Sequence, residues 1–329
     1  MAAEPKSKRR RLVLAIAGAL LAPAGPAAAQ RANRTSRVGV LFAAGLEGYY
    51  AAFRAELRQL GYVEGRNLQL DARWAEGDLT RLPQLAAELL ALKPDVIVAS
   101  STPSIVALKR ATTTVPIVMA TSADSVRSGF VATLSRPGAN ITGNSAMNFD
   151  LSLKTIHLLH ACVPQVTRIG LLLTRNSAYN PQLDEIVAGA RAFGVTVVPL
   201  RADTEAEIES VFNGAAQEKL GGMAVFGDSV FVAHKRKLAE KAAAMRLPTI
   251  YQWRSHVDAG GLMSYGPDIN SLWRMAARCV DRILKGANPA ELPVQQPTVF
   301  ELFINGTVAK NLGITIPPDV LLRADAVIE

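Results

Sequence analysis

The chain alternates short apolar runs with longer segments in which apolar residues recur at helical spacing. The clearest runs are 37–43 (RVGVLFA), 95–100 (DVIVAS), 168–174 (RIGLLLT) and 222–227 (GMAVFG). A continuous apolar run predicts a strand that is buried on both faces, and a helix between successive strands predicts a parallel sheet covered on both sides. We therefore expect an α/β protein built on parallel sheets.

This pattern stops and restarts near the middle of the chain. The first series is strand 37–43, helix 47–60, strand 67–74, helix 79–93, strand 95–100, helix 103–111 and strand 116–121. A polar loop, a further helix and a break at Pro137-Gly138 then lead to a short strand at 140–143. The second series is helix 150–162, strand 168–174, helix 181–193, strand 195–201, helix 205–219, strand 222–227, helix 231–245 and strands 248–252 and 262–265. Two such series predict two lobes.

The last part of the chain should return to the first lobe before it ends in the second. A helix at 269–285 is followed by a Pro-rich connector, a strand at 299–305 and a short helix that ends at Leu312. Gly or Pro marks breaks at 140–145, 265–268 and 292–298, where we expect three crossovers. Residues 37–143 and 267–292 would form lobe 1, and residues 144–266 and 293–329 would form lobe 2. The expected fold class is thus two parallel-sheet, Rossmann-like lobes joined by three crossover segments.

Residues 1–29 have the three parts of a secretory signal. A basic patch at 8–11 precedes an apolar run at 12–21, and small residues end at Ala29, where we expect cleavage. The run is too short to span a bilayer, so we expect a soluble, exported product; the Sec and twin-arginine routes both stay open. This segment carries +4 of the formal charge of +8. The remaining +4, without a basic stripe, does not indicate a nucleic-acid partner.

Familiar enzyme and metal patterns fail in this sequence. Gly227-Asp228-Ser229 lacks the Asp-x-x-His that would complete a GDS-type esterase, and 39–45 lacks the Gly-Lys-Ser/Thr of a P-loop. His157 and His160 have no evident acid or thiolate partner for a metal. We expect no catalytic site, no metal and no cofactor. Cys162 and Cys279 fall on helices of different lobes, so two buried free thiols are expected rather than a disulfide.

Loops that follow parallel strands are where α/β proteins bind ligands. The candidates are Ala44, Ser101, Thr102, Thr121, Ser122 and Asp124 in the first lobe, and Asn176, Tyr179, Asp228 and Tyr265 in the second. Ser101 and Thr102 precede Pro103 at the start of a helix, whose free N–H groups favour an anion, although a plain N-cap without a ligand is also open. The hydroxyls at 121–122 should lie beside them and form a carboxylate-binding mouth.

Acidic and aromatic residues complete the candidate site. Asp228 is the acid expected to meet a ligand cation, and Asp124 is either a second such acid or a helix cap. Tyr179, Phe231 and Trp253 could wall an apolar ligand side chain, and packing alone also explains each of them.

Four segments carry a resemblance to one family. They are 135–143 (SRPGANITG), 247–268 (LPTIYQWRSHVDAGGLMSYGPD), 280–305 (VDRILKGANPAELPVQQPTVFELFIN) and 312–318 (LGITIPP). Together they resemble the ABC-transporter substrate-binding family whose characterised members bind tryptophan or phenylalanine. The resemblance implies a type I periplasmic-binding fold that closes on its ligand by hinge motion.

The resemblance also implies roles for site residues. Hydroxyls and backbone N–H groups at Ser101, Thr102, Thr121 and Ser122 would take the carboxylate of an amino acid, and Asp228 would take its ammonium group. The sequence departs from the family at 124–126, which read Asp-Ser-Val where Asp-Pro-Val is common.

The function implied is that of a periplasmic solute receptor. We expect a monomer that captures a small carboxylate-bearing, amino-acid-like ligand and delivers it to an ABC permease in the inner membrane. A secreted α/β hydrolase acting on a small carboxylate and a ligand-sensing domain stay as alternatives, because one fold serves many functions.

Overall fold

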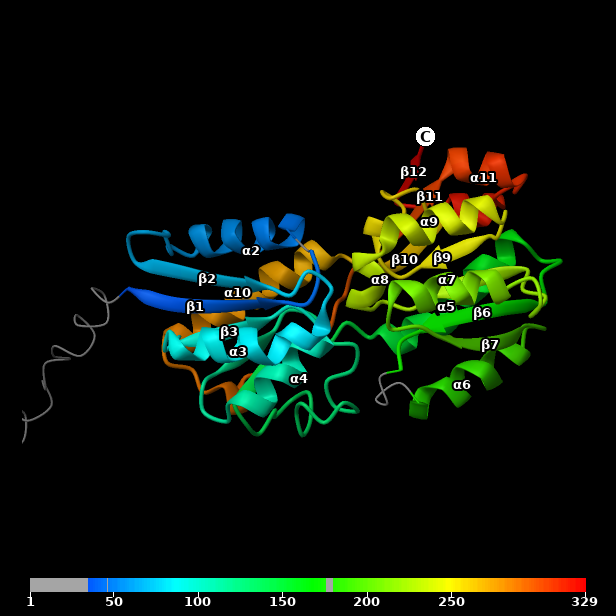
Figure 1. The fold of residues 1–329 in the computed structure, drawn as a ribbon. Coiled ribbons are helices and arrows are strands. Elements are labelled where there is room, and N and C mark those ends of the chain that lie inside the picture. The colour runs from blue at the N-terminus through cyan, green and yellow to red at the C-terminus, as the bar shows by residue number, and fades with distance from the viewer. Residues whose placement is uncertain (1–34, 46, 176–179) are drawn as a thin grey trace, which may run out of the picture.

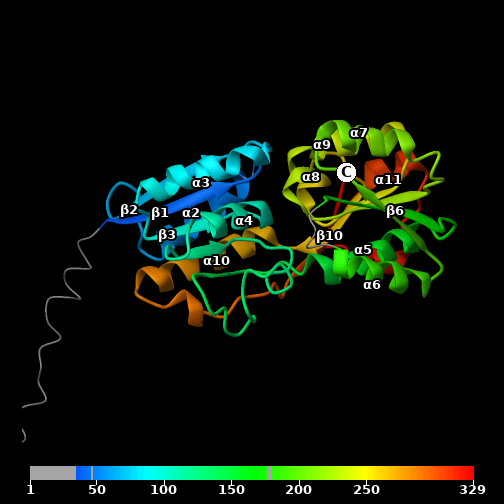
Figure 2. The same ribbon diagram turned by 60° about the horizontal axis from the view of Figure 1, so that its bottom comes forward.

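Two α/β lobes lie side by side, each with its own sheet (Figure 1). The computed structural model describes residues 35–45, 47–175 and 180–329, so the signal-like segment lies outside the described residues. The first sheet has five parallel strands in the order β2-β1-β3-β4-β5. The second has seven strands in the order β12-β11-β10-β9-β8-β6-β7, and its β10–β11 pair is antiparallel. The lobes remain side by side in a view turned by 60° (Figure 2). The expected fold class is confirmed.

The strands follow the apolar runs. Those of the first sheet are β1 (Ser36–Phe42), β2 (Leu68–Trp74), β3 (Val96–Ala99), β4 (Ile117–Met119) and β5 (Ile141–Gly143). Those of the second are β6 (Arg168–Leu173), β7 (Thr196–Arg201), β8 (Gly222–Val225), β9 (Thr249–Tyr251), β10 (Met263–Pro267), β11 (Phe300–Asn305) and β12 (Ala326–Ile328). Strands β3 and β8 are buried along their whole length, as expected where helices cover both faces.

Helices cover both faces of each sheet. The first lobe has α2 (Glu47–Gln59), η1 (Leu79–Arg81), α3 (Leu82–Ala91), α4 (Thr102–Ala111), α10 (Ile269–Leu284) and η4 (Pro289–Glu291). The second has α5 (Asn148–Cys162), α6 (Asn180–Arg191), α7 (Glu205–Gly214), α8 (Ser229–Ala233), α9 (Lys235–Ala244), η3 (Arg254–His256), α11 (Gly306–Leu312) and α12 (Pro318–Leu321). Helix α10 returns to pack beside α2, where the fully buried Trp273 lies 5.9 Å from the ring of Phe53. Within the described ranges, every helix is too short or too polar to cross a membrane.

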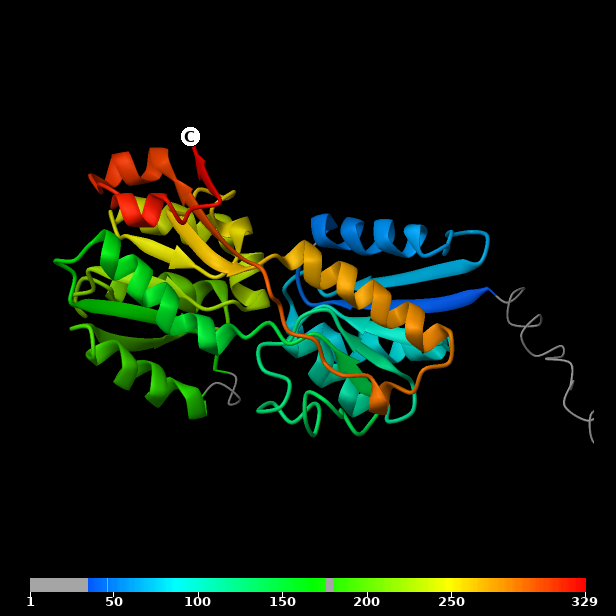
Figure 3. The ribbon, with the colours of Figure 1, turned by 180° about the vertical axis from the view of Figure 1, so that it is seen from behind.

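The first and third crossovers run next to each other between the lobes (Figure 3). The backbone N–H of Ser145 donates to Gln295 O (2.9 Å), and that of Gln295 donates to Gly143 O (2.8 Å). The side chain of Asn144 donates to the carbonyl of Leu272 on α10, at 2.8 Å, and so ties the first crossover to the helix that follows the second. The exact lobe boundaries given above stay a prediction.

Two glycines lie at the ends of strands where the chain leaves for the other lobe. Gly143 has φ +123°, and a Cβ there would lie 2.4 Å from Met119 O. A Cβ on Gly266 would lie 1.7 Å from Gln252 O. Because each glycine rests directly on the backbone of the neighbouring strand's end, these positions exclude any side chain.

Some expected elements are wrong. The structure describes all of 121–138 and contains no helix there. Instead Asp124 Oδ1 accepts from the N–H groups of Val126 (3.1 Å) and Arg127 (2.9 Å), and the resulting turn ends at Gly129, whose φ is +66°. The helix expected at 231–245 is two helices, α8 and α9, that meet at His234. Strand β12 and helix α12 were not expected.

The two cysteines are free thiols. Cys162 is buried at the end of α5, whereas Cys279 on α10 is only partly buried. Burial raises the pKa of each thiol to about 11, so both are protonated and unreactive near neutral pH.

Candidate functional site

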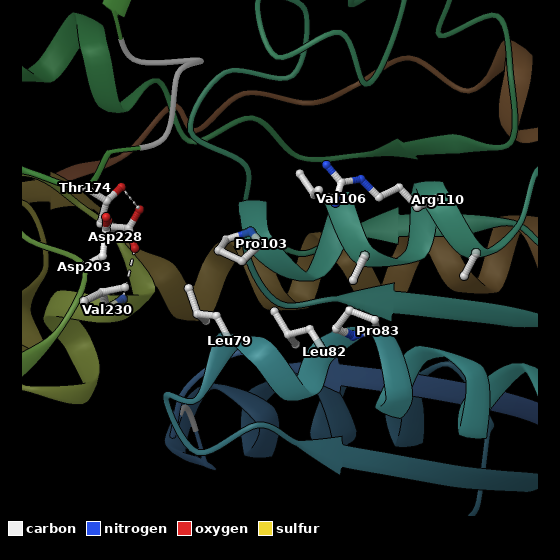
Figure 4. Close-up of a pocket in the computed structure, with 12 residues that line it drawn as sticks. Leu79, Leu82, Pro83, Pro103, Val106, Arg110, Thr174, Asp203, Asp228 and Val230 are labelled. Carbon is white, nitrogen blue, oxygen red and sulfur yellow. Dashed lines mark hydrogen bonds between the residues drawn. The ribbon is translucent and has the colours of Figure 1, made fainter.

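The lobes face each other across a cavity of about 490 Å³ (Figure 4). Its lining in the first lobe is mainly apolar and comes from η1, α3 and α4: Leu79, Leu82, Pro83, Pro103, Val106, Ala107, Arg110 and Ala111. The second lobe contributes Thr174, Asp203, Asp228 and Val230. This volume is typical of a site for a small molecule. The cavity therefore offers an apolar wall on one side and acids on the other.

A second cavity, of about 10 Å³, lies where the loops after β3, β4, β8 and β9 converge. Its lining residues are Ser101, Thr102, Pro103, Thr121, Ser122, Ala123, Ala146, Gly227, Asp228, Ser229 and Trp253. Pro103 and Asp228 line both cavities, so the two adjoin. The small cavity has room for about one oxygen atom.

Ser101 and Ser122 bring hydroxyls to the small cavity. Their side chains are 4% and 1% exposed, and neither Oγ has a hydrogen-bond partner among the described residues. Ser101 occupies the N-cap position of α4, yet its side chain makes no capping hydrogen bond. Capping therefore does not account for Ser101. A buried hydroxyl without a partner costs about 1–3 kcal/mol, and the described residues do not offset this cost at either serine.

Thr102 and Thr121 line the same cavity, but each hydroxyl oxygen already has a protein partner. Thr121 Oγ1 donates to Ser100 O at 2.7 Å, and Thr102 Oγ1 accepts from the N–H of Ala123 at 3.2 Å. The single hydroxyl proton of Thr121 is thus committed to a carbonyl. In this conformation Thr121 orients the loop after β4 and does not donate to a carboxylate.

Asp228 lies at the junction of the two cavities and is 4% exposed. Its Oδ2 accepts from Thr174 Oγ1 (3.2 Å), and its Oδ1 accepts from the N–H of Val230 (3.0 Å) at the start of α8. The loop that carries it is clamped by Gln252, whose Oε1 accepts from the N–H of Gly227 at 2.8 Å. These bonds hold a buried acid in a fixed orientation beside both cavities.

Three predicted site residues lie outside both linings. Ala44 is buried directly after β1. Asp124 accepts hydrogen bonds within its own turn and forms an ion pair with Arg127 at 3.6 Å; because no helix follows, it is not the helix cap offered as the alternative. The hydroxyl of Tyr265 accepts a hydrogen bond from Lys154 Nζ at 2.5 Å, and Tyr265 lines neither cavity. Asn176 and Tyr179 lie outside the described residues.

The sequence did not single out the apolar lining of the large cavity, and it offered Trp253 only as a possible wall for an apolar ligand side chain. Trp253 lines the small cavity, is 3% exposed, and carries an indole N–H with no partner among the described residues. Its place in a loop after a strand made it a candidate wall residue, but gave no indication of a role for its indole N–H. Leu79, Leu82 and Val106 read in the sequence as ordinary core positions of helices, because the spacing of apolar residues does not show which face meets a second lobe.

A buried histidine supports the loops behind the site. His256 is 1% exposed; its Nδ1 lies 3.2 Å from Trp253 O, and its Nε2 lies 3.2 Å from Phe231 O. Burial lowers its pKa to about 4, so the ring is neutral at pH 7. Within the described ranges, His, Cys, Asp and Glu form no cluster of three or more that could hold a metal ion.

Two lobes with mostly parallel sheets, three crossovers and a cavity between the lobes define a bilobal binding protein of the type I periplasmic class. A family model described as ABC transporter substrate binding protein matches residues 40–328. The chain belongs to this family. The family expected from the four sequence segments is confirmed.

Three similar proteins illustrate how far the likeness extends. A tyrosine-binding protein from Clostridioides difficile (strain R20291) is 27% identical over 264 residues, which is 80% of this chain and 75% of that protein. A solved ABC domain in complex with L-Trp from Streptococcus pneumonia has a TM-score of 0.83 and 28% identity, and covers 89% of this chain and 100% of its own. A conserved domain protein from Vibrio cholerae has the same TM-score and coverage with 30% identity. The fold of this chain is therefore shared almost end to end with these structures.

Proposed function

We propose that this chain captures a free amino acid between its lobes for an ABC importer. Ser101 and Ser122 bind the carboxylate, and Asp228 binds the ammonium group. The observation that carries the proposal is the small cavity, where two buried, unpartnered hydroxyls lie beside a buried acid. A zwitterionic head group supplies the acceptor that the hydroxyls lack and a cation for the acid.

The two cavities would hold different parts of the ligand. The small one has room for one carboxylate oxygen, and the remaining atoms extend past Pro103 and Asp228 into the large cavity. There Leu79, Leu82 and Val106 offer apolar surface to the ligand side chain. One relative is a tyrosine-binding protein and another was solved in complex with L-Trp, and both support an amino acid as the ligand class.

Binding is favoured over hydrolysis by the surroundings of the serines. A nucleophilic serine requires a base within hydrogen-bond reach. The hydroxyls of Ser101 and Ser122 have no partner among the described residues, and both ring nitrogens of His256 face backbone carbonyls.

The proposal extends to where the protein works and to the partner that receives its ligand. The protein is exported, cleaved after Ala29, and works as a monomer in the periplasm. On binding its ligand it closes and docks on an inner-membrane permease. Membership of a family of ABC transporter substrate-binding proteins supports this role.

Isothermal titration calorimetry of the mature chain against the proteinogenic amino acids tests the proposal. We expect at least one to bind, and Ser101→Ala to weaken that binding by about 10-fold or more, because a hydrogen bond to a charged group contributes about 1.5–3 kcal/mol. Asp228→Asn should weaken it similarly.

Ser125→Ala is the matched control. Ser125 Oγ is also buried without a partner among the described residues, but Ser125 lines neither cavity, so its removal should leave affinity unchanged. Absence of binding by every amino acid would overturn the ligand class. Equal effects of Ser101→Ala and Ser125→Ala would remove Ser101 from the site.

A further inference from the structure

Trp253 belongs to one lobe by sequence and to the other by packing. It follows β9 of the second sheet. Its side chain, together with Val232 of α8, joins an apolar cluster whose other members come mostly from β1–β4, α2 and α10 of the first lobe. Trp253 is therefore a wedge from the second lobe that is seated in the first.

The indole N–H of Trp253 needs a hydrogen-bond acceptor. An indole N–H can donate but cannot accept, so it needs an acceptor, whereas a serine hydroxyl can serve either role. Trp253 Nε1 is buried and has no acceptor among the described residues, and Trp253 lines the small cavity together with Ser101 and Ser122. Asp228, the acid at this cavity, accepts from Thr174 and Val230. Ser101, Ser122 and Trp253 thus each carry a buried polar atom without a partner among the described residues, and all three line a space for about one oxygen atom.

We propose that Trp253 donates its indole N–H to the carboxylate oxygen that Ser101 and Ser122 bind, so that the anionic group of the ligand joins the two lobes. This inference rests on the proposed function and extends it. An anion held by donors of both lobes stabilises the closed arrangement in a way that a ligand without a carboxylate does not. Through Trp253, closure of the two lobes then depends on the carboxylate of the ligand.

Backbone contacts keep the wedge in place. The carbonyl of Trp253 faces His256 Nδ1 at 3.2 Å, and the ring of His256 stacks on Tyr251 with centroids 4.7 Å apart. The preceding Gln252 is fixed through Gly227. These contacts within the second lobe fix the backbone of Trp253, while its side chain packs against the first lobe.

The test compares two conservative variants. Trp253→Phe keeps an aromatic ring in the cluster and removes the N–H. Trp273→Phe is the control, because Trp273 Nε1 is also buried without a partner among the described residues, while Trp273 lines neither cavity. Titration calorimetry uses the amino acid that binds wild type most tightly and the same compound with its carboxylate converted to an amide.

Trp253→Phe should weaken binding of the acid by about 10- to 100-fold, whereas its effect on the amide should be under about 3-fold. Trp273→Phe should change neither affinity. Equal losses for acid and amide, or no loss for the acid, would overturn the inference while wild-type binding keeps the proposed function. If the wild-type protein binds no carboxylate ligand, the proposed function and the inference about Trp253 are both wrong.

A measurement on the wild-type chain covers the case in which Trp253→Phe fails to fold. In ¹⁵N-labelled protein the indole N–H of Trp253 gives its own NMR signal, separate from those of Trp74 and Trp273. Addition of the acid should shift the Trp253 signal downfield, as expected for a new hydrogen bond, and the amide should shift it less. An unmoved Trp253 signal at saturating acid would contradict the inference.

Discussion

Acid should destabilise this protein through His256. Both ring nitrogens lie 3.2 Å from backbone carbonyls, those of Trp253 and Phe231. Burial disfavours the charged ring and is the largest effect, and it lowers the pKa of His256 from 6.5 to about 4. The two carbonyls act in the opposite direction, and the positive charge of Lys235 lowers the pKa further. The histidine therefore folds as a neutral ring and is protonated more readily in the unfolded chain.

The direction and size of the effect follow from linkage. Because the folded-state pKa lies below the unfolded value, the unfolded chain binds more protons between about pH 6.5 and pH 4, and stability falls as the pH falls through this window. The gap between the two pKa values corresponds to about 3 kcal/mol, present in full above pH 6.5 and lost by about pH 4. His256 is 1% exposed, so solvent screening does not reduce this contribution.

Urea unfolding followed by circular dichroism, at several pH values from about 7.5 to 4.5, measures the effect. His256→Gln does not titrate and keeps an amide that can donate to one carbonyl, so its stability should vary less with pH than that of wild type. His157→Gln, at an exposed histidine of α5, should retain the wild-type pH dependence. Parallel pH profiles for wild type and His256→Gln would refute the reasoning.

Two further changes test the fold. Gly266→Ala places a Cβ 1.7 Å from Gln252 O and should lower the free energy of unfolding in urea by about 3 kcal/mol. The control is Gly214→Ala, which should be neutral or slightly stabilising because no atom lies within 4 Å of the new methyl group. Equal stabilities of the two variants would contradict this prediction. Thr204→Ala removes the cap that accepts from the N–H of Glu207 at 3.3 Å on α7 and should cost about 1 kcal/mol in the same assay; an unchanged midpoint would show that the cap contributes nothing.

The sheets could be predicted because burial on both faces leaves a direct trace in the sequence. Strands β1, β3, β6 and β8 coincide with the continuous apolar runs to within about two residues. The helix expected between the strand at 116–121 and Pro137-Gly138 does not form, because Asp124 closes a local hydrogen-bonded turn and Gly129 takes the left-handed conformation. Strand β12 was missed because its three residues are too short a run to show a pattern.

The site could be predicted only in part. The rule that ligands bind after parallel strands selects loops, and it led to Ser101, Ser122 and Asp228, which line the small cavity. The same rule selects Ala44 and Tyr265, because it does not say where each side chain points. The apolar lining of the large cavity and the packing of Trp253 against the first lobe depend on how two lobes distant in sequence meet, and spacing along one chain does not encode that.

A crystal structure of the mature chain with its tightest-binding amino acid tests the central claim most directly. We predict the ligand between the lobes, with one carboxylate oxygen within hydrogen-bond distance of Ser101 Oγ and Ser122 Oγ, its ammonium group beside Asp228, and its side chain against Leu79, Leu82 and Val106. An amino acid bound outside this cavity, or bound there with its carboxylate turned away from Ser101 and Ser122, would contradict the account.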